Sequence, residues 1–177
     1  GTLIENLYQV DLLILSQLKS SKYNQDKLLS SSESSRLNEW VSQDGGRLLV
    51  LGGQGMFSLE SDVFRSISSI LPVEIPEGPS YRTTPVFPKL TGFGLRSEAL
   101  VSWRSVPQSQ LPPLESHHEL GRPNMGAEVL METGTGLPLL VWQTSGTGRV
   151  MCAGSDSFWR YGLPAQGVAA INAPSLD

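Results

Sequence analysis

Several features that mark whole classes of protein are scarce in this 177-residue sequence. Its one cysteine, Cys152, excludes an internal disulfide framework and leaves the cellular compartment open. It has no cluster of basic residues and a net charge of -4, so we expect no nucleic-acid partner. No apolar run approaches the ~18 residues of a membrane span. The remaining composition is typical of one globular domain over residues 1–177, and the first residue, Gly1, predicts a fragment of a longer protein.

The passage from Arg47 to Ser58 is the most informative part of the sequence. Residues 48–51 form a continuous aliphatic run, as expected of a strand buried on both faces of a parallel sheet. Glycines directly after such a strand allow a sharp turn and a close approach to a ligand or to a packed helix. This pattern indicates the fold more clearly than the function.

The residues before this passage complete a βαβ unit. An apolar run at residues 10–15 predicts a first strand, and Ser30 with Glu33 predicts a capping box for the helix that follows. Leu37, Trp40 and Val41 have the spacing of that helix's buried stripe, and the glycines at 45 and 46 end it. Two strands joined in this way lie parallel in one sheet, with a right-handed crossover.

The rest of the chain predicts a second crossover helix and a mixed sheet. Apolar residues repeat at helical spacing over 63–71, and Pro72 ends that helix. Residues 72–88 suit edge strands or an extended loop, and residues 89–124 are irregular with one short helix near 97–101. Strands follow at 127–132, 138–143 and 148–153, and the turn at 145–148 makes the last two an antiparallel hairpin.

Five segments together carry a resemblance to a known family. They are WVSQDGGRLLVLGGQGMFS (40–58), LPVEIP (71–76), GAEVLM (126–131), PLLVWQ (138–143) and GRVMCAGSDSFWR (148–160). This set, which covers most of the chain, resembles the class I glutamine amidotransferase-like superfamily, in particular the uncharacterised domains of large bacterial membrane proteins, often beside von Willebrand factor A-type domains. The resemblance implies a flavodoxin-like three-layer α/β fold, with a mostly parallel central sheet and an antiparallel C-terminal hairpin.

The resemblance also places the family's nucleophile elbow at Gly53, Gln54 and Gly55. Active members carry a cysteine there, on a tight turn that exposes the thiol, and a histidine paired with a carboxylate activates it. Gln54 stands near that position and cannot form a thioester. Cys152 lies in an apolar strand, where we expect a neutral thiol packed as a small hydrophobic group. We therefore predict no catalytic residue.

Other residues admit a functional and a structural interpretation, and we favour the structural one for each. His117 and His118 lie in a polar stretch, 112–123, that we expect to be a surface loop; a metal site there would need further ligands such as Glu115 or Glu119, so we predict none. Ser58 could be a nucleophile but suits the cap of a helix beginning near Leu59. The glycines at 52–55 could cradle a phosphate but lack a P-loop lysine, so we predict no cofactor.

A second cluster follows the last strand. Ser155, Asp156 and Arg160 are expected at the same sheet edge as the glycine turn, where Asp156 and Arg160 could bind a polar ligand. Alternatively, Asp156 caps a helix, and Phe158 with Trp159 anchors the segment. The candidate ligand site is therefore Gly53, Gln54, Gly55, Ser155, Asp156 and Arg160.

Three functions remain open at this point. The first is a non-catalytic amidotransferase-like module, used for interaction or ligand sensing, in a membrane-anchored bacterial envelope protein. The second is a hydrolase that uses the crevice at the strand carboxyl ends, and the third is a carbohydrate-binding module with Trp103 and Trp159 as a stacking platform. Partners are expected to be other domains of the parent protein or a protein that pairs with an exposed sheet edge.

Overall fold

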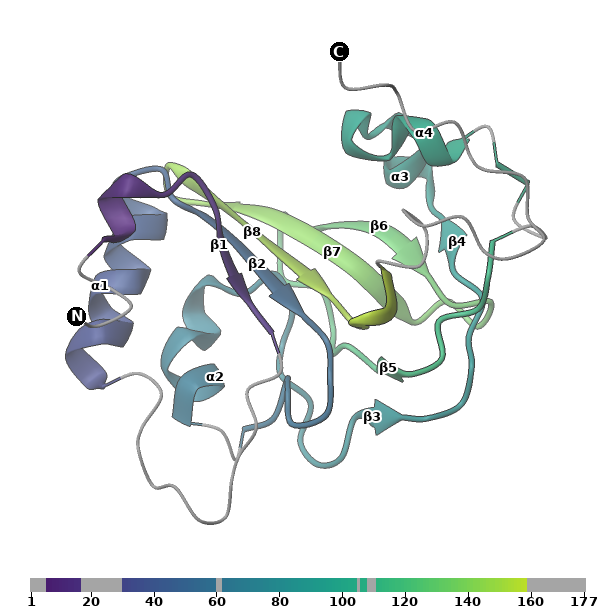
Figure 1. Cartoon of the computed structure of the whole chain (residues 1–177), viewed down its shortest axis with the longest axis horizontal. Coiled ribbons are helices and arrows are strands. Elements are labelled where there is room, and N and C mark those ends of the chain that lie inside the picture. Colours follow the sequence, from purple (N-terminus) through teal and green to yellow (C-terminus); the bar gives the residue numbers. More distant parts are fainter. Residues whose placement is uncertain (1–5, 17–29, 60–61, 105, 108–110, 159–177) are drawn as a thin grey trace.

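A six-stranded sheet in the order β1-β2-β8-β7-β6-β4 organises the chain (Figure 1). This computed structural model describes residues 6–16, 30–59, 62–104, 106–107 and 111–158. The strands are β1 (Leu13–Leu15), β2 (Arg47–Leu51), β4 (Lys89–Leu90), β6 (Glu128–Glu132), β7 (Pro138–Ser145) and β8 (Gly148–Ala153). A separate two-stranded sheet pairs β3 (Tyr81–Arg82) with β5 (His117–His118).

The main sheet is mixed, which confirms the α/β class. β1 pairs parallel with β2, and β2 pairs parallel with β8. β7, β6 and β4 continue the sheet with antiparallel pairings, beginning with the predicted hairpin of β7 and β8. The antiparallel part is thus larger than that hairpin, because β4 and β6 extend it to the edge.

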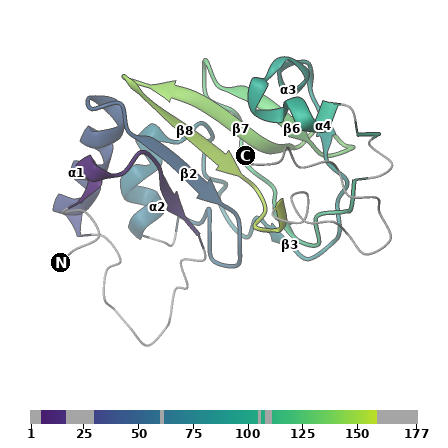
Figure 2. The ribbon, with the colours of Figure 1, turned by 45° about the horizontal axis from the view of Figure 1, so that its top comes forward.

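Helices cover the two faces of the sheet unequally. α1 (Ser31–Ser42), α2 (Asp62–Ile67) and the short helix η2 (Ser68–Ile70) lie on one side of the parallel strands (Figure 2). The short helices α3 (Gly92–Arg96), η3 (Glu98–Leu100) and α4 (Val101–Arg104) gather near β4 and β6. A further turn, η1 (Leu7–Gln9), precedes β1. None of the helices in the described ranges has the length and hydropathy of a membrane span.

The predicted helix of the βαβ unit forms as its sequence pattern indicates. Ser30 Oγ accepts a hydrogen bond from the Glu33 backbone N–H at 3.3 Å, and the Glu33 carboxylate accepts one from the Ser30 N–H at 2.7 Å. The Ser30 backbone N–H and the Ser30 hydroxyl, which donates to the same carboxylate at 2.8 Å, both lower the pKa of Glu33. Trp40 is buried with its neighbours of the stripe, and a Cβ on Gly46 would overlap its indole ring. A glycine is therefore required where the chain turns from α1 into β2.

The sequence was less informative about the segments around this unit. Phe64, Ile67 and Ile70 are buried as predicted. α2 is described from Asp62 on, and residues 60–61, which lie between it and the predicted start near Leu59, are outside the described ranges. The single helix predicted near 97–101 is instead a series of short helices that begins at Gly92, because the Thr91 hydroxyl accepts the Gly94 N–H and starts a turn there. Gly94 permits this turn to lie against the backbone of β6.

Replacing Ser30 with alanine should lower the free energy of unfolding by about 1 kcal/mol, because an N-cap hydroxyl is lost. Chemical denaturation with circular dichroism measures this change. Glu39→Ala, at an exposed position of the same helix, is the control and should cost little, since alanine favours helix. Equal losses in the two variants would contradict the capping assignment.

Candidate functional site

The carboxyl ends of β2 and β8 approach each other closely where the sequence places the candidate site. The Gly52 N–H donates to the Ala153 carbonyl at 2.7 Å, which continues the parallel pairing past the last paired residues. A Cβ on Gly52 would lie 2.5 Å from the carbonyl carbon and oxygen of Gly154. Only glycine fits at Gly52, because any side chain there would prevent this close approach of the two strand ends.

The turn after β2 is tight and partly strained. Gly53 is buried, Gln54 is exposed, and Gly55 has a φ of +89°. The Met56 N–H closes the turn on the Gly53 carbonyl at 3.0 Å. Phe57 follows with a φ of +47°, a left-handed conformation that is costly for an aromatic residue. Its fully buried ring packs against Phe64 and His118, each with a centroid distance of 5.4 Å.

The two histidines are not in a surface loop, so that prediction is wrong. His117 and His118 form β5 and are 7% and 2% exposed. The His118 backbone N–H donates to the Gly154 carbonyl at 2.6 Å, and this bond holds β5 against the edge of the main sheet. The signal that was missed is the pair of leucines, Leu114 and Leu120, that flank the histidines and are themselves buried.

His118 connects the glycine turn to the small sheet. Its Nε2 lies 2.8 Å from the Gly53 carbonyl oxygen, and its Nδ1 lies 2.8 Å from Ser80 Oγ. A carbonyl only accepts hydrogen bonds, so Nε2 carries the proton and, in the neutral ring, Nδ1 accepts from the Ser80 hydroxyl. Burial lowers the pKa of His118, which favours this neutral form.

His117 is buried on the other side of the strand, and burial lowers its pKa as well. Its Nδ1 has no hydrogen-bond partner in the described part of the chain. Beside it, Arg82 and Glu119 form an ion pair at 2.6 Å that bridges β3 to the residue after β5. No group of three or more metal-ligating side chains occurs within the described residues.

The segment after β8 contributes one buried serine to this edge. Ser155 Oγ donates to the Ser116 carbonyl at 2.7 Å and accepts the Ser157 N–H at 3.0 Å. A helical turn begins at Ser157, directly after Asp156, so Asp156 stands at the position that the structural interpretation gave it. Asp156 is half-buried, and its carboxylate accepts the Ser157 hydroxyl at 3.3 Å. Arg160 and Trp159 lie outside the described residues.

These hydrogen bonds show which of the predicted site residues lie close together. Gly53 and Ser155 are both held by the β5 segment, through His118 and through Ser116. Gln54 instead faces solvent. Cys152 is fully buried in β8, where burial raises the pKa of its thiol, and this confirms its structural role. The residues that sequence reasoning missed are therefore His118 and Ser80.

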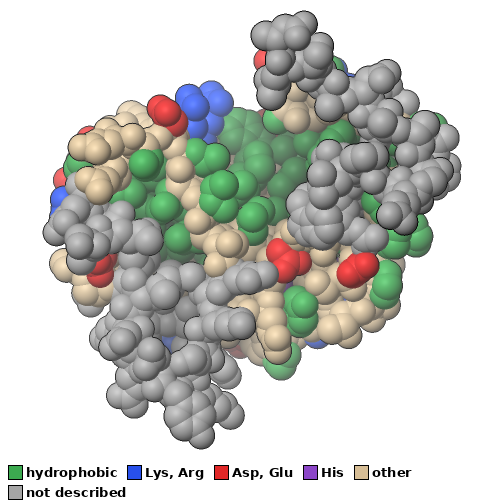
Figure 3. Space-filling model, in the orientation of Figure 1, with side chains coloured by type: hydrophobic (Ala, Val, Ile, Leu, Met, Phe, Trp, Pro, Cys, Tyr) green, Lys and Arg blue, Asp and Glu red, His purple; other side chains and the backbone are tan. Residues whose placement is uncertain are grey.

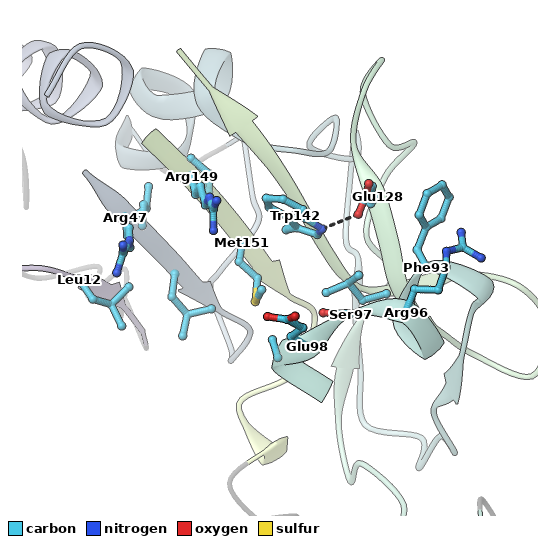
Figure 4. A pocket seen from close by; sticks show the side chains of 15 residues that line it. Leu12, Arg47, Phe93, Arg96, Ser97, Glu98, Glu128, Trp142, Arg149 and Met151 are labelled. Carbon is cyan, nitrogen blue, oxygen red and sulfur yellow. Dashed lines mark hydrogen bonds between the residues drawn. The ribbon is translucent and has the colours of Figure 1, made fainter. Parts of the chain in front are cut away.

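A second feature lies on the sheet face opposite α1 and α2. A hollow of about 650 Å³ extends from β1 to α3 and η3 (Figure 4). It is lined mainly by apolar side chains, with Arg47 and Arg149 near one end and Arg96 and Glu98 at the other. A space-filling view shows hydrophobic side chains gathered over this face, with basic side chains at the border (Figure 3). No sequence pattern had indicated this hollow.

The stability of the protein should fall as pH falls below about 6.5, the ordinary histidine pKa. Below that pH, His117 and His118 bind protons in the unfolded state but not in the folded state, because burial lowers the folded pKa of both residues. The loss of stability therefore grows as the pH falls, until the pH reaches those lowered pKa values. Unfolding free energies measured between pH 8 and pH 5 test this. His118→Gln should reduce the dependence, and an unchanged slope would contradict the assignment.

Comparison with known proteins supports the fold but no particular function. No protein-family model matches the chain, and no curated protein matches it. Among solved structures, the chain is similar to cytoplasmic protein STM1381 from Salmonella typhimurium LT2 (TM-score 0.67, 24% identity), covering 93% of this chain and 68% of that one. It is also similar to cytoplasmic protein STM3548 from Salmonella typhimurium (0.66, 18%), covering 88% and 64%. A GH42 β-galactosidase from G. stearothermophilus matches less well (0.51, 17%), covering 81% and 19%.

Proposed function

We propose that this chain is a non-catalytic, amidotransferase-like interaction module of a larger bacterial envelope protein. The observation that carries the proposal is the use of His118, whose two ring nitrogens are both engaged in fastening the glycine turn to β3. A histidine that activates a nucleophile needs one nitrogen directed at an accessible reacting group. Here one nitrogen holds a backbone carbonyl, and the other holds a serine that is 6% exposed.

The neighbouring residues support the same conclusion. Gln54, at the exposed apex of the turn, has no nucleophilic atom, and the Cys152 thiol is buried and held neutral. The α2 helix has six residues and begins well after Gly55, so the glycine turn does not open into a helix N-terminus that could cradle a phosphate. The hydrogen bonds at this edge of the sheet therefore hold the backbone in one conformation.

The flavodoxin-like three-layer arrangement is part of this proposal. α1 and α2 supply one outer layer over the parallel strands. On the other face, α3, η3 and α4 lie toward β4 and β6, and the described residues leave the parallel strands open. The edge strands β1 and β4 are where the predicted pairing with another domain or protein would occur.

A serine hydrolase is the second candidate, because Ser80 Oγ lies 2.8 Å from His118 Nδ1. The burial of both side chains opposes it, since a substrate carbonyl would have no approach. Labelling by a fluorophosphonate that Ser80→Ala abolishes would favour this candidate. Carbohydrate binding has less support, because Trp103 is half-buried and stacks on Phe158 with a centroid distance of 6.4 Å.

Assays of glutamine hydrolysis with the wild type and with Gln54→Cys test the proposal. We expect no ammonia release from either protein, because His118 is committed to Gly53 and Ser80. Thiol titration is the control: Gln54→Cys should expose one reactive thiol in the folded protein, whereas Cys152 should react only after unfolding.

Either of two results would count against the module. Hydrolysis by the wild type would show an active site that does not use Gln54. Hydrolysis by Gln54→Cys alone would show that His118 can leave Gly53 and act as a base, and its structural assignment would then be wrong.

A further inference from the structure

The register of the sheet aligns one row of side chains across five strands on its open face. Ile14 pairs with Leu49, Leu49 with Met151, Met151 with Trp142, and Trp142 with Glu128. Paired residues in neighbouring strands point to the same face. Ile14 is 50% exposed, and the other members of this cross-strand row are half-buried.

The opposite face of the same strands is fully covered. Leu48, Val50, Val150 and Cys152 alternate with the row along β2 and β8 and are buried beneath α1 and α2 in one core cluster. Parallel strands are normally covered on both faces, because both faces are apolar. The sheet face that carries the cross-strand row, with Leu12 beside it at 47% exposure, therefore lacks a covering layer in the described structure.

Two arginines border this face at the amino ends of β2 and β8. Arg47 and Arg149 are partners in the parallel register, so two like charges lie next to each other (Figure 4). Both are exposed, and neither has a carboxylate within 4.0 Å in the described part of the chain, where the ion pairs are Arg82–Glu119 and Lys89–Glu132. Arg149 lies over the Trp142 ring at 5.6 Å, and Glu128 is engaged by the Trp142 N–H at 2.9 Å.

We infer that this face binds an amphipathic α-helix of a partner protein, with acidic residues over Arg47 and Arg149. This inference rests on the proposed role as an interaction module. The apolar side chains of the cross-strand row would pack against the apolar stripe of such a helix. A helix is also the element that covers parallel strands in α/β folds. Carboxylates on the helix would relieve the repulsion between the two arginines.

The direction of the helix follows from the same geometry. Helices that cover parallel strands run antiparallel to them, as in a βαβ unit. The bound helix would then end over the amino ends of β2 and β8, where Arg47 and Arg149 lie. The C-terminal end of a helix carries partial negative charge, so the helix dipole and its acidic side chains act together on the arginines.

The two longer segments outside the described ranges do not carry the sequence pattern of such an acidic helix. After Phe158, glycine or proline occurs at 162, 164, 167 and 174, and the longest run without either is residues 168–173. That run contains no aspartate or glutamate, whereas the inferred helix ends in acidic residues. Residues 17–29 carry three lysines and one aspartate, which is the wrong sign of charge for Arg47 and Arg149.

The test uses a labelled synthetic helix of about 18 residues, ~27 Å long, with leucines at i, i+3, i+4 and i+7 and three glutamates in its last turn. Fluorescence anisotropy measures its binding to the whole chain. We expect the wild type to bind this peptide and Arg47→Glu/Arg149→Glu to bind it about tenfold more weakly, since both attractions become repulsions. A peptide with lysines in place of the glutamates should show the reverse preference.

Two further variants separate the charge contribution from the apolar one. Arg36→Glu/Arg122→Glu makes the same charge change away from the hollow and should bind as the wild type does. Ile14→Thr keeps a β-branched residue in β1 but removes apolar surface, and it should weaken both peptides alike. Circular dichroism establishes that every variant is folded.

Four results would overturn the inference. In the first, the wild type does not bind the acidic peptide, and in the second it binds the acidic and lysine peptides equally. In the third, the chain dimerises and Arg47→Glu/Arg149→Glu abolishes the dimer. In the fourth, decanoate displaces the labelled peptide at a lower concentration than the unlabelled peptide does. The third would assign the face to a second copy, and the fourth to a small amphiphile. Peptide failure without glutamine hydrolysis removes this inference alone, whereas hydrolysis by the wild type removes the proposed function.

Discussion

The hydrogen bonds of His118 at the carboxyl ends of β2 and β8 are the interaction on which this structure depends. The imidazole fixes the Gly53 carbonyl, and the His118 backbone N–H fixes the Gly154 carbonyl, so one residue holds the ends of two neighbouring parallel strands. Gly52 allows those strands to approach as closely as they do. The glycine turn, the small sheet and the segment after β8 are thereby fixed relative to one another.

The edge of the sheet and its open face differ in how their side chains are engaged. At the edge, the polar groups of Gly53, Ser80 and Ser155 bond to one another or to backbone, and little remains for a ligand. On the open face, the apolar row and the two arginines lack a covering layer in the described chain.

The sequence predicted the parallel part of the fold because local signals agreed there. The Ser30 capping box, the buried stripe around Trp40 and the glycine stop all indicate one helix between two strands, and the structure confirms each. The apolar runs that became β7 and β8, with the turn between them, indicated the hairpin equally well. The short helices after Thr91 depend on a hydroxyl hydrogen bond and a close backbone contact, which periodicity does not reveal.

The candidate site was predicted only in part, for a physical reason. Strand ends can be located from apolar runs, so the sequence predicts Gly53 and Ser155 at one edge of the sheet. His118 and Ser80 are 38 residues apart and meet through a two-residue pairing of β3 with β5. Polar flanks made that segment resemble a loop, and its burial follows from tertiary contacts of Leu114 and Leu120. The cross-strand row needed the register itself, which no short sequence pattern contains.

Nitrogen-15 NMR of the His118 ring is the most direct test of this account. We expect a neutral imidazole with its proton on Nε2, as the bond to the Gly53 carbonyl requires, and no protonation near the ordinary histidine pKa of about 6.5. A ring that exchanges between tautomers, or that gains its proton at that ordinary pKa, would contradict the claim that His118 holds the turn.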